Sequence, residues 1–585
     1  MNFLRNLLAA ILGTLIAFGI IFFMFVFFIS LVNTEEAVTV KKNSVLELQM
    51  KYAITDYTGN KEGDPFDVLF EKAQGLDEIL HAIKVAKEDN DIKGISINNN
   101  YISAGISSTQ AIRNALADFK ESGKFIYAFG DFYMQKDYYL ASVADSIFLN
   151  PVGAMDFKGL AAEVLFFKDL QDKTGVKMEV VRHGKYKSAV EPFLSNEMSE
   201  ENRTQIRELI GSIWNTIVSE IALDRSISEE DINVIADTLG GRKPEYAKAS
   251  GLLDDVIYYD EYAKRLKQAV GIVEDDKLNI ISLEDYTRVS RKKKLLSGKD
   301  KIAIIYAQGE IFYGEGGPNY IGQGIINKAI IKARDDKDVK AIVLRVNSPG
   351  GSALTSDIIW RELDIAKKEK PLVVSMGDVA ASGGYYISAG ADKIYAEPTT
   401  ITGSIGVFGI VPNVNELAAK IGINAEQVGT NKNSVDYSLF EPMSDEFRAF
   451  VKEGIESTYQ TFLGKVSEGR NITIARADSL AQGRVWSGAQ ARELGLVDEL
   501  GGLEDAIEAA ALLANVDSYS VRKYPKYKSS FERFMEDFGG TSILNKEEII
   551  RREIGTEIYG LYKEVKSVME QKGFQARLPF TLTIK

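Results

Sequence analysis

The chain contains two diverged copies of one stretch, and this internal repeat limits the folds that it can adopt. Residues 91–151 align without a gap on residues 338–398, at a constant offset of 247, with 15 identities in 61 positions, where chance gives about four. At 585 residues the chain is also too long for a single hydrophobic core. We therefore expect one domain for each copy.

Apolar runs alternate with helix-like segments in the second copy. The predicted strands are residues 302–307, 341–346, 371–376 and 393–396, and the predicted helices are residues 324–335, 354–367 and 382–389. Such alternation is typical of βαβ units, in which helices cover a parallel sheet. The predicted fold class is therefore α/β, with two tandem repeats.

The N-terminal residues predict a membrane anchor. No charged residue occurs between Arg5 and Glu35, and residues 7–32 are almost entirely apolar. As a helix this run spans about 39 Å, enough to cross a hydrocarbon core of about 30 Å with some tilt. It is longer than the apolar region of a cleavable signal peptide, which favours an uncleaved transmembrane helix. Because Arg5 precedes the run and acidic residues follow it, the large C-terminal part is expected outside the cytoplasm.

Composition argues against several kinds of partner. A net charge of −13 argues against nucleic acid, because phosphate binding needs a basic face. The chain has no cysteine, which rules out disulfides and thiolate metal sites. Its two histidines, His81 and His183, lie far apart in the sequence, so we expect no metal and no cofactor.

The repeat and the apolar run together predict the domain boundaries. In order, these are a cytoplasmic N-terminus at 1–6, a transmembrane helix at 7–32, a first repeat at 45–287, a basic linker at 288–300, a second repeat at 301–520 and a helical tail at 521–585.

Ser382 is the candidate nucleophile. It follows an apolar run and precedes the glycine pair Gly383 and Gly384. Small residues and glycines let a substrate carbonyl approach a serine on a tight strand-to-helix turn. Alternatively, Ser382 is simply a helix N-cap, a position that serine favours. The first copy has Gln135 at the aligned position, so the second copy supplies any such nucleophile.

With only two histidines available, a lysine is a candidate general base. Lys187, in the first copy, is followed by the small or apolar residues 188–190. Burial among such residues would lower the lysine pKa and leave the amine neutral, as a base must be. Most lysines are solvated surface charges, and His183, four positions earlier, is a rival base.

Two glycine-rich segments offer supporting groups. Residues 347–352 follow a predicted strand, so their backbone N–H groups could face a cleft and form an oxyanion hole. Residues 402–406 contain Ser404, whose hydroxyl could orient a base. Either segment could also be an ordinary tight connection.

At these motifs the chain resembles the signal peptide peptidase A family of serine–lysine peptidases, in its long, duplicated, membrane-anchored form. The matching segments are residues 186–193, 346–351, 402–406 and 483–488, with the segment around Ser382. The resemblance covers most of residues 1–520 in the same order. It implies that both repeats adopt the Clp-protease/crotonase-like α/β fold.

The resemblance also implies roles for particular residues. Ser382 would be the nucleophile, Lys187 the general base and Ser404 the group that orients the lysine, while Gly351 and Gly383 would form the oxyanion hole.

The implied activity is hydrolysis of signal peptides and other short apolar peptides through an acyl-enzyme. The implied enzyme is a homo-oligomer, expected to be a tetramer. It would sit in the bacterial inner membrane through residues 7–32, with its catalytic part on the periplasmic side. The alternatives are a catalytically inactive membrane scaffold and an acyl-thioester enzyme on the same fold.

Overall fold

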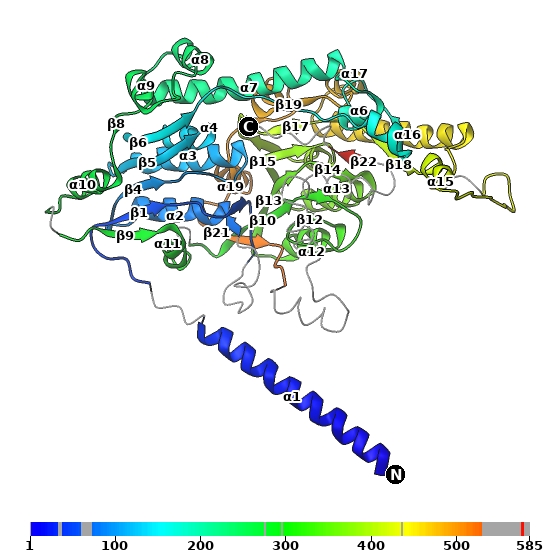
Figure 1. The fold of residues 1–585 in the computed structure, drawn as a ribbon, viewed down its shortest axis with the longest axis horizontal. Helices are drawn as coiled ribbons and strands as arrows, with labels where there is room; N and C mark the ends of the chain where they lie inside the picture. The colour runs from blue at the N-terminus through cyan, green and yellow to red at the C-terminus, as the bar shows by residue number, and fades with distance from the viewer. Residues whose placement is uncertain are drawn as a thin grey trace.

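Two α/β repeats lie side by side in the chain (Figure 1). The computed structural model describes residues 2–32, 38–59, 73–273, 276–293, 297–434, 437–528 and 575–577.

The first repeat is built on a six-stranded parallel sheet with the strand order β8-β6-β5-β4-β1-β9. Its strands are β1 (Ser44–Leu48), β4 (Ile92–Asn98), β5 (Phe125–Met134), β6 (Ser146–Asp156), β8 (Asp255–Val256) and β9 (Asn279–Ser282).

The second repeat reproduces this order as β20-β16-β15-β13-β10-β21, again with parallel pairing. Its strands are β10 (Asp300–Gln308), β13 (Val339–Ser348), β15 (Leu372–Ala381), β16 (Lys393–Ala396), β20 (Glu499–Leu500) and β21 (Tyr519–Tyr524). The end of β15 also pairs with β17 (Ile401–Gly403), which pairs with β19 (Val485–Ser487). The same order of strands in both sheets agrees with the duplication read from the sequence.

Helices related by the alignment offset of 247 cover equivalent positions in the two repeats. The two pairs are α2 (Leu76–Glu88) with α12 (Gln323–Asp335), and α3 (Ile106–Lys120) with α13 (Ala353–Lys367). The buried face of α2 is mostly apolar, and α12 buries only apolar residues, as helices packed on a sheet require. The buried face of α3 also contains polar residues, such as Gln110 and Arg113. The strands and helices predicted for the second copy are confirmed, with ends that differ by a few residues.

Buried polar contacts join strands β13 and β15 of the second repeat to the first repeat. The Arg345 guanidinium lies 2.8 Å from the Asp56 carboxylate and also donates to the Ser375 hydroxyl. The Asp378 carboxylate, near the end of β15, accepts bonds from the backbone N–H and hydroxyl of Ser108 at 2.8 and 2.6 Å. Losing one partner of a buried ion pair typically costs about 3–5 kcal/mol. These contacts therefore fix β15 against the first repeat.

A smaller sheet crosses the boundary between the repeats. In it β7 (Lys177–Arg182) of the first repeat pairs antiparallel with β18 (Phe408–Asn413) of the second. The strand β14 (Gly350–Ser352) pairs with β11 (Glu310–Ile311) and with β22 (Gln575–Arg577), and β12 (Tyr320–Ile321) completes the sheet.

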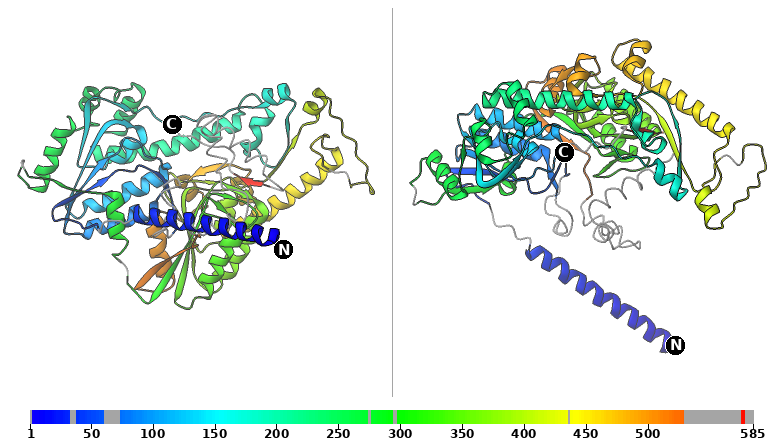
Figure 2. Two further views of the ribbon diagram at one scale, coloured as in Figure 1. Left: turned by 60° about the horizontal axis from the view of Figure 1, so that its bottom comes forward. Right: turned by 45° about the horizontal axis from the view of Figure 1, so that its top comes forward.

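Two long helices lie over this region, α7 (Glu200–Arg225) and α16 (Asp445–Gly469). Figure 2 shows α7, in teal, running from the first repeat across to the second. Its N-cap Ser199 accepts a bond from the N–H of Asn202, which fixes where the helix starts. Helix α7 contacts β19 of the second repeat.

Helix α1 (Asn2–Val32) lies apart from the α/β body (Figure 1). Its segment Arg5–Met24 has a mean hydropathy of 2.6 and no buried residues, so α1 is long and apolar enough to cross a membrane. Strand β21 begins in the predicted second repeat and extends to residue 524 of the predicted tail (521–585), and β22 lies within that tail. Residues 529–574 and 578–585 lie outside the described residues.

Candidate active site

Ser382 occupies the turn between β15 and α14 (Gly383–Ser388). Its φ is +55° and its ψ is −113°, a conformation that non-glycine residues rarely adopt. The N–H of Ser382 donates to the carbonyl of Gly403 at 2.8 Å. Although Ser382 stands at the N-cap position, its side chain makes no capping bond. The strained turn leaves the hydroxyl available for another partner.

That partner is the amine of Lys187. The Lys187 Nζ lies 2.8 Å from the Ser382 Oγ, and both side chains have no exposed surface. It also lies 3.0 Å from the Ser404 Oγ and 3.1 Å from the Ser404 carbonyl. The structure thus brings together three of the predicted site residues, two from the second repeat and one from the first.

Burial lowers the pKa of Lys187 well below its usual value, because the charged amine loses its hydration. Among the described residues no carboxylate pairs with this amine, so no opposite charge offsets the cost of burying its own charge. A neutral amine has two N–H donors and one lone pair. With its donors directed at the carbonyl and hydroxyl of Ser404, the lone pair is left for the proton of Ser382.

Two glycines of the second repeat pack directly against Lys187. A Cβ on Gly483, whose φ is +81°, would lie 2.6 Å from the Cβ of Lys187, and one on Gly406 would lie 3.2 Å from its Cδ. The ring centroid of Phe408 lies 6.0 Å from the Nζ. Glycine at these positions therefore lets the second repeat close tightly over the lysine of the first.

Replacing Gly483 with alanine is expected to lower kcat by about 10- to 100-fold, because the new Cβ would push the lysine backbone away from Ser382. Alanine at positive φ also costs about 1 kcal/mol or more. The matched control is Gly495→Ala, since Gly495 has a φ of +79° but open space where a Cβ would point. Equal loss of activity in the two variants would show that backbone strain, not displacement of Lys187, causes the effect. The measurements are kcat and thermal unfolding.

The predicted oxyanion glycines lie on adjoining elements. Gly351 is on β14, where its φ is +149° and a Cβ would lie 2.1 Å from the carbonyl oxygen of Ile311. Gly383 is the first residue of α14, and α14 contacts β14. Gly384 packs against the carbonyl of Ser348, with 2.7 Å between that oxygen and a Cβ built there. Gly383 thus follows Ser382 directly, and Gly351 lies on a strand that contacts the helix after Ser382.

Neither histidine lies at the Ser382 hydroxyl. The His183 ring packs on Tyr459 with a centroid separation of 4.1 Å, and the His81 ring lies against the backbone carbonyl of Ser290 at 3.0 Å. The imidazole of His183, the rival base, is thus occupied by an aromatic contact. The geometry favours Lys187.

Gln205 is a buried residue near the site that the sequence reasoning missed. It lies on α7, and its amide contacts both chain neighbours of Lys187. A single polar residue on the buried face of a helix is a weak signal, and its partner segment is not adjacent in the sequence.

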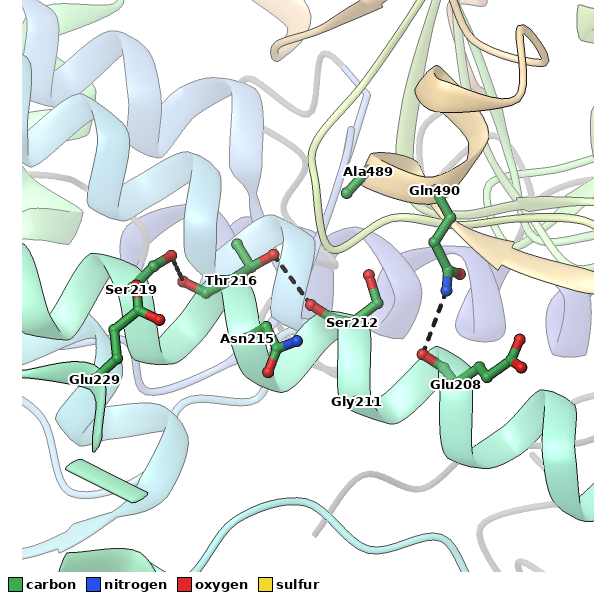
Figure 3. Close-up of a pocket in the computed structure, with 9 residues that line it drawn as sticks. All are labelled: Glu208, Gly211, Ser212, Asn215, Thr216, Ser219, Glu229, Ala489 and Gln490. Carbon is green, nitrogen blue, oxygen red and sulfur yellow. Dashed lines mark hydrogen bonds between the residues drawn. The ribbon is translucent and has the colours of Figure 1, made fainter. Parts of the chain in front are cut away.

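A separate surface hollow lies along α7 and α18 (Gly488–Glu493) (Figure 3). It is lined by polar groups that include Glu208, Ser212 and Gln490, and the Gln490 side chain donates to the carbonyl of Glu208. Neither Lys187 nor Ser382 lines this hollow. The candidate catalytic pair is instead enclosed between the repeats.

Comparison with known proteins identifies the family. Peptidase family S49 matches residues 118–273 and 364–517, one segment in each repeat. The chain belongs to peptidase family S49. It is a serine protease of that family, and the resemblance seen in the sequence is confirmed.

Two relatives match this chain over most of its length. Protease 4 of Haemophilus influenzae is 40% identical over 448 residues, which cover 75% of this chain and 73% of the relative. The chloroplastic serine protease SPPA of Arabidopsis thaliana is 33% identical over 486 residues, covering 82% and 70%.

Among solved structures, a ClpP1 mutant from Listeria monocytogenes covers 35% of this chain and 94% of its own, with 15% identity and a TM-score of 0.24. The fold assignment follows from the strand orders and the two family matches rather than from this similarity. The predicted fold class, two tandem α/β repeats after an N-terminal apolar helix, is confirmed.

Proposed function

We propose that this S49 protease is a membrane-anchored endopeptidase that uses Ser382 as nucleophile and Lys187 as general base to degrade signal peptides and other short apolar peptides. The observation that carries the proposal is the 2.8 Å separation of the Lys187 Nζ and the Ser382 Oγ in a fully buried site. A buried lysine with a depressed pKa and a hydroxyl partner is the arrangement that base catalysis at a serine requires.

The proposed reaction has two halves. The neutral Lys187 amine takes the Ser382 proton while the Oγ attacks the scissile carbonyl, and the backbone N–H groups of Gly351 and Gly383 hold the resulting oxyanion. The lysine ammonium then protonates the leaving amine as the C–N bond breaks, which leaves an acyl-enzyme. In the second half Lys187 deprotonates a water, which attacks the ester carbonyl. The bond from that carbon to the Ser382 Oγ then breaks, and the lysine ammonium returns the proton to the Oγ as the acid product leaves. Losing one oxyanion donor typically costs about 2.7–4 kcal/mol of barrier.

Replacing Ser404 with alanine should lower kcat by about 10- to 100-fold and leave KM almost unchanged. Its hydroxyl is one of the groups that hold the amine, so without it the lysine would spend less time aligned with Ser382. Ser388→Ala is the control, because Ser388 is an equally buried serine whose hydroxyl donates to Gly384 within its own helix. Wild-type kcat in Ser404→Ala would remove the orienting role.

The strand that pairs between β14 and β18 supports a peptide substrate over a thioester. An extended segment of the chain itself, β22, pairs antiparallel with β14 at Gly351 and with β18 at Phe408. The space between β14 and β18 thus holds an extended segment through main-chain pairing, and this mode of peptide recognition is common.

The apolar helix α1 supports attachment to a bilayer. Tethering would keep the enzyme beside apolar peptides that remain in the membrane and so raise their effective concentration. The charge asymmetry around the helix supports a periplasmic catalytic part in a bacterial inner membrane. Large exposed apolar side chains near residues 421–450, such as Val428 and Phe450, support assembly into a homo-oligomer, which we propose is a tetramer.

Labelling with a fluorophosphonate tests this function. The full chain in detergent should form one covalent adduct, located at Ser382 by peptide mapping, with a rate that rises as pH increases. A synthetic signal peptide should be cleaved under the same conditions. A folded chain that forms no adduct at Ser382 would favour the inactive scaffold.

A further inference from the structure

One side chain of helix α7, that of Gln205, bonds to the loop that carries Lys187. Gln205 is 1% exposed, and its Nε2 donates to the carbonyl of Tyr186 at 3.1 Å and to the hydroxyl of Ser188 at 3.0 Å. Tyr186 and Ser188 are the residues on either side of Lys187. One amide group thus bonds to the backbone carbonyl before the candidate base and to the side-chain hydroxyl after it.

The other end of the same amide reaches the second repeat. The Gln205 Oε1 accepts a bond from the N–H of Val485 at 3.4 Å. Val485 pairs with Gly403 across β19 and β17, and the carbonyl of Gly403 accepts the N–H of Ser382. Gln205 therefore stands between the segment that carries the base and the strands that hold the nucleophile.

The surroundings of Gln205 fix which way its amide points. The Nε2 faces the Tyr186 carbonyl and lies 3.0 Å from the Asn202 Oδ1, while the Oε1 faces a backbone N–H. Asn202 is itself held, because its Nδ2 donates to the buried Glu191 carboxylate at 2.6 Å. A flipped amide would set oxygen against oxygen, so the side chain has a single satisfied orientation.

The amide has a role that packing alone would not require. An apolar side chain of the same length would fill the same space, but it would leave the Tyr186 carbonyl and the Val485 N–H without this partner. Segment 186–188 also bonds to the second repeat through the N–H of Tyr186 and the carbonyl of Gln482, at 2.9 Å. Gln205 adds bonds to the residues on both sides of Lys187 and links them to Val485 of the second repeat.

We propose that Gln205 is a positioning residue, which keeps the Lys187 amine aligned with the Ser382 hydroxyl by tying the lysine loop to strand β19. This inference rests on the proposed Ser382 and Lys187 chemistry.

The test is Gln205→Met in the full chain in detergent, since methionine keeps the length of the side chain and removes both kinds of bond. We expect kcat to fall by about 10- to 100-fold, because misplacement of a catalytic group by about 1 Å can cost that much, with KM changed less than about threefold. We also expect the midpoint of the rate–pH profile to move to higher pH. An amine that leaves its dry site regains hydration, so its pKa rises and more alkali is needed to deprotonate it.

A second variant, Gln205→Glu, gives an independent measurement. It retains an acceptor for Val485 but loses the donor to Tyr186, and its carboxylate would stabilise a charged lysine nearby. Its rate–pH midpoint should therefore move in the same direction. If thermal melting shows that Gln205→Met does not fold, the test rests on Gln205→Glu. A rate–pH midpoint equal to that of the wild type in Gln205→Glu would then overturn the proposal.

Ser212→Ala is the matched control. Ser212 lies on the same helix (Figure 3) and also bonds to the second repeat, through 2.7 Å between its Oγ and that of Ser487, but it does not flank Lys187. Its kcat and pH midpoint should match the wild type. A merely structural role for Gln205 would reduce activity equally at every pH, and that result would overturn the proposal, as would a folded Gln205→Met enzyme with wild-type kcat.

The outcome is separable from that of the proposed function. If Lys187→Met stays active, Lys187 is not the general base for Ser382, and the positioning role of Gln205 is then wrong as well. If Lys187→Met is inactive and Gln205→Met has wild-type kcat and pH midpoint, the roles of Ser382 and Lys187 are retained and only the positioning role of Gln205 is wrong.

Discussion

Replacing Ser382 with alanine should abolish peptide hydrolysis and fluorophosphonate labelling, with a loss in kcat of about 10⁴- to 10⁶-fold. The change removes only the Oγ, which is the atom 2.8 Å from the Lys187 amine. The first repeat offers no substitute, because Gln135 stands at the aligned position and its amide is committed to the backbone of residues 158 and 159. The measurements are kcat on a signal peptide and mass analysis after labelling.

The fold of this variant should be intact. The Ser382 backbone is held by its N–H bond to Gly403 and by the bond from Tyr386 to its carbonyl, and neither involves the side chain. A melting temperature near that of the wild type would show that lost activity reflects lost chemistry. Hydrolysis that survives at more than about one part in a thousand would contradict the assignment of Ser382 as nucleophile.

The strained residues around the amine need external support. Ser382 and Ser404 both have positive φ values, +55° and +52°, and such conformations cost about 1–3 kcal/mol each unless the surroundings impose them. Here the surroundings come partly from the first repeat, through the Arg345 pair with Asp56 and the bonds between Asp378 and Ser108. The first repeat thus contributes the proposed base, Lys187, and also helps to hold the turn that carries the proposed nucleophile.

The scaffold could be predicted from the sequence because its signals are local. Alternating apolar strands and periodic helices give parallel α/β repeats, and the 247-residue offset relates α2 to α12 and α3 to α13. Ser382 also has a local signature, since small residues and glycines surround it.

The lysine could not be found from local pattern alone. Its burial depends on contacts with Gly406 and Gly483, more than two hundred positions away, and on the antiparallel pairing of β7 with β18. Lys187 emerged from the scarcity of histidine and from the family resemblance. Gln205 had only a weak signal, because both of its partner segments reach it only through tertiary folding.

Replacing Lys187 with methionine should also abolish turnover, and the wild-type pH profile should show why. A base must be neutral, so wild-type activity should rise with pH through the pKa of the buried lysine and then level off. Because burial depresses this pKa, the rise should lie well below the usual range for lysine, about pH 10.4. A maximum near about pH 6 would instead indicate a histidine. His183→Gln is the control and should keep the wild-type profile, since that ring packs on Tyr459 away from the hydroxyl.

Lys187→Met should abolish turnover but stabilise the folded chain. The sign of the stability effect follows from the link between proton binding and folding. Burial lowers the pKa of Lys187 in the folded chain, whereas the unfolded chain binds a proton on it below about pH 10.4. The folded chain therefore binds this proton less tightly, and the lysine destabilises the fold at pH values below about 10.4. The penalty is about 1.4 kcal/mol for each unit of pKa depression and vanishes above the unfolded pKa. Lys187→Met escapes it, so the melting temperature of the variant relative to wild type should rise as pH falls from about 10 to about 7. A difference that stays constant over this range would mean that the folded lysine is charged, and a charged amine cannot be the base for Ser382.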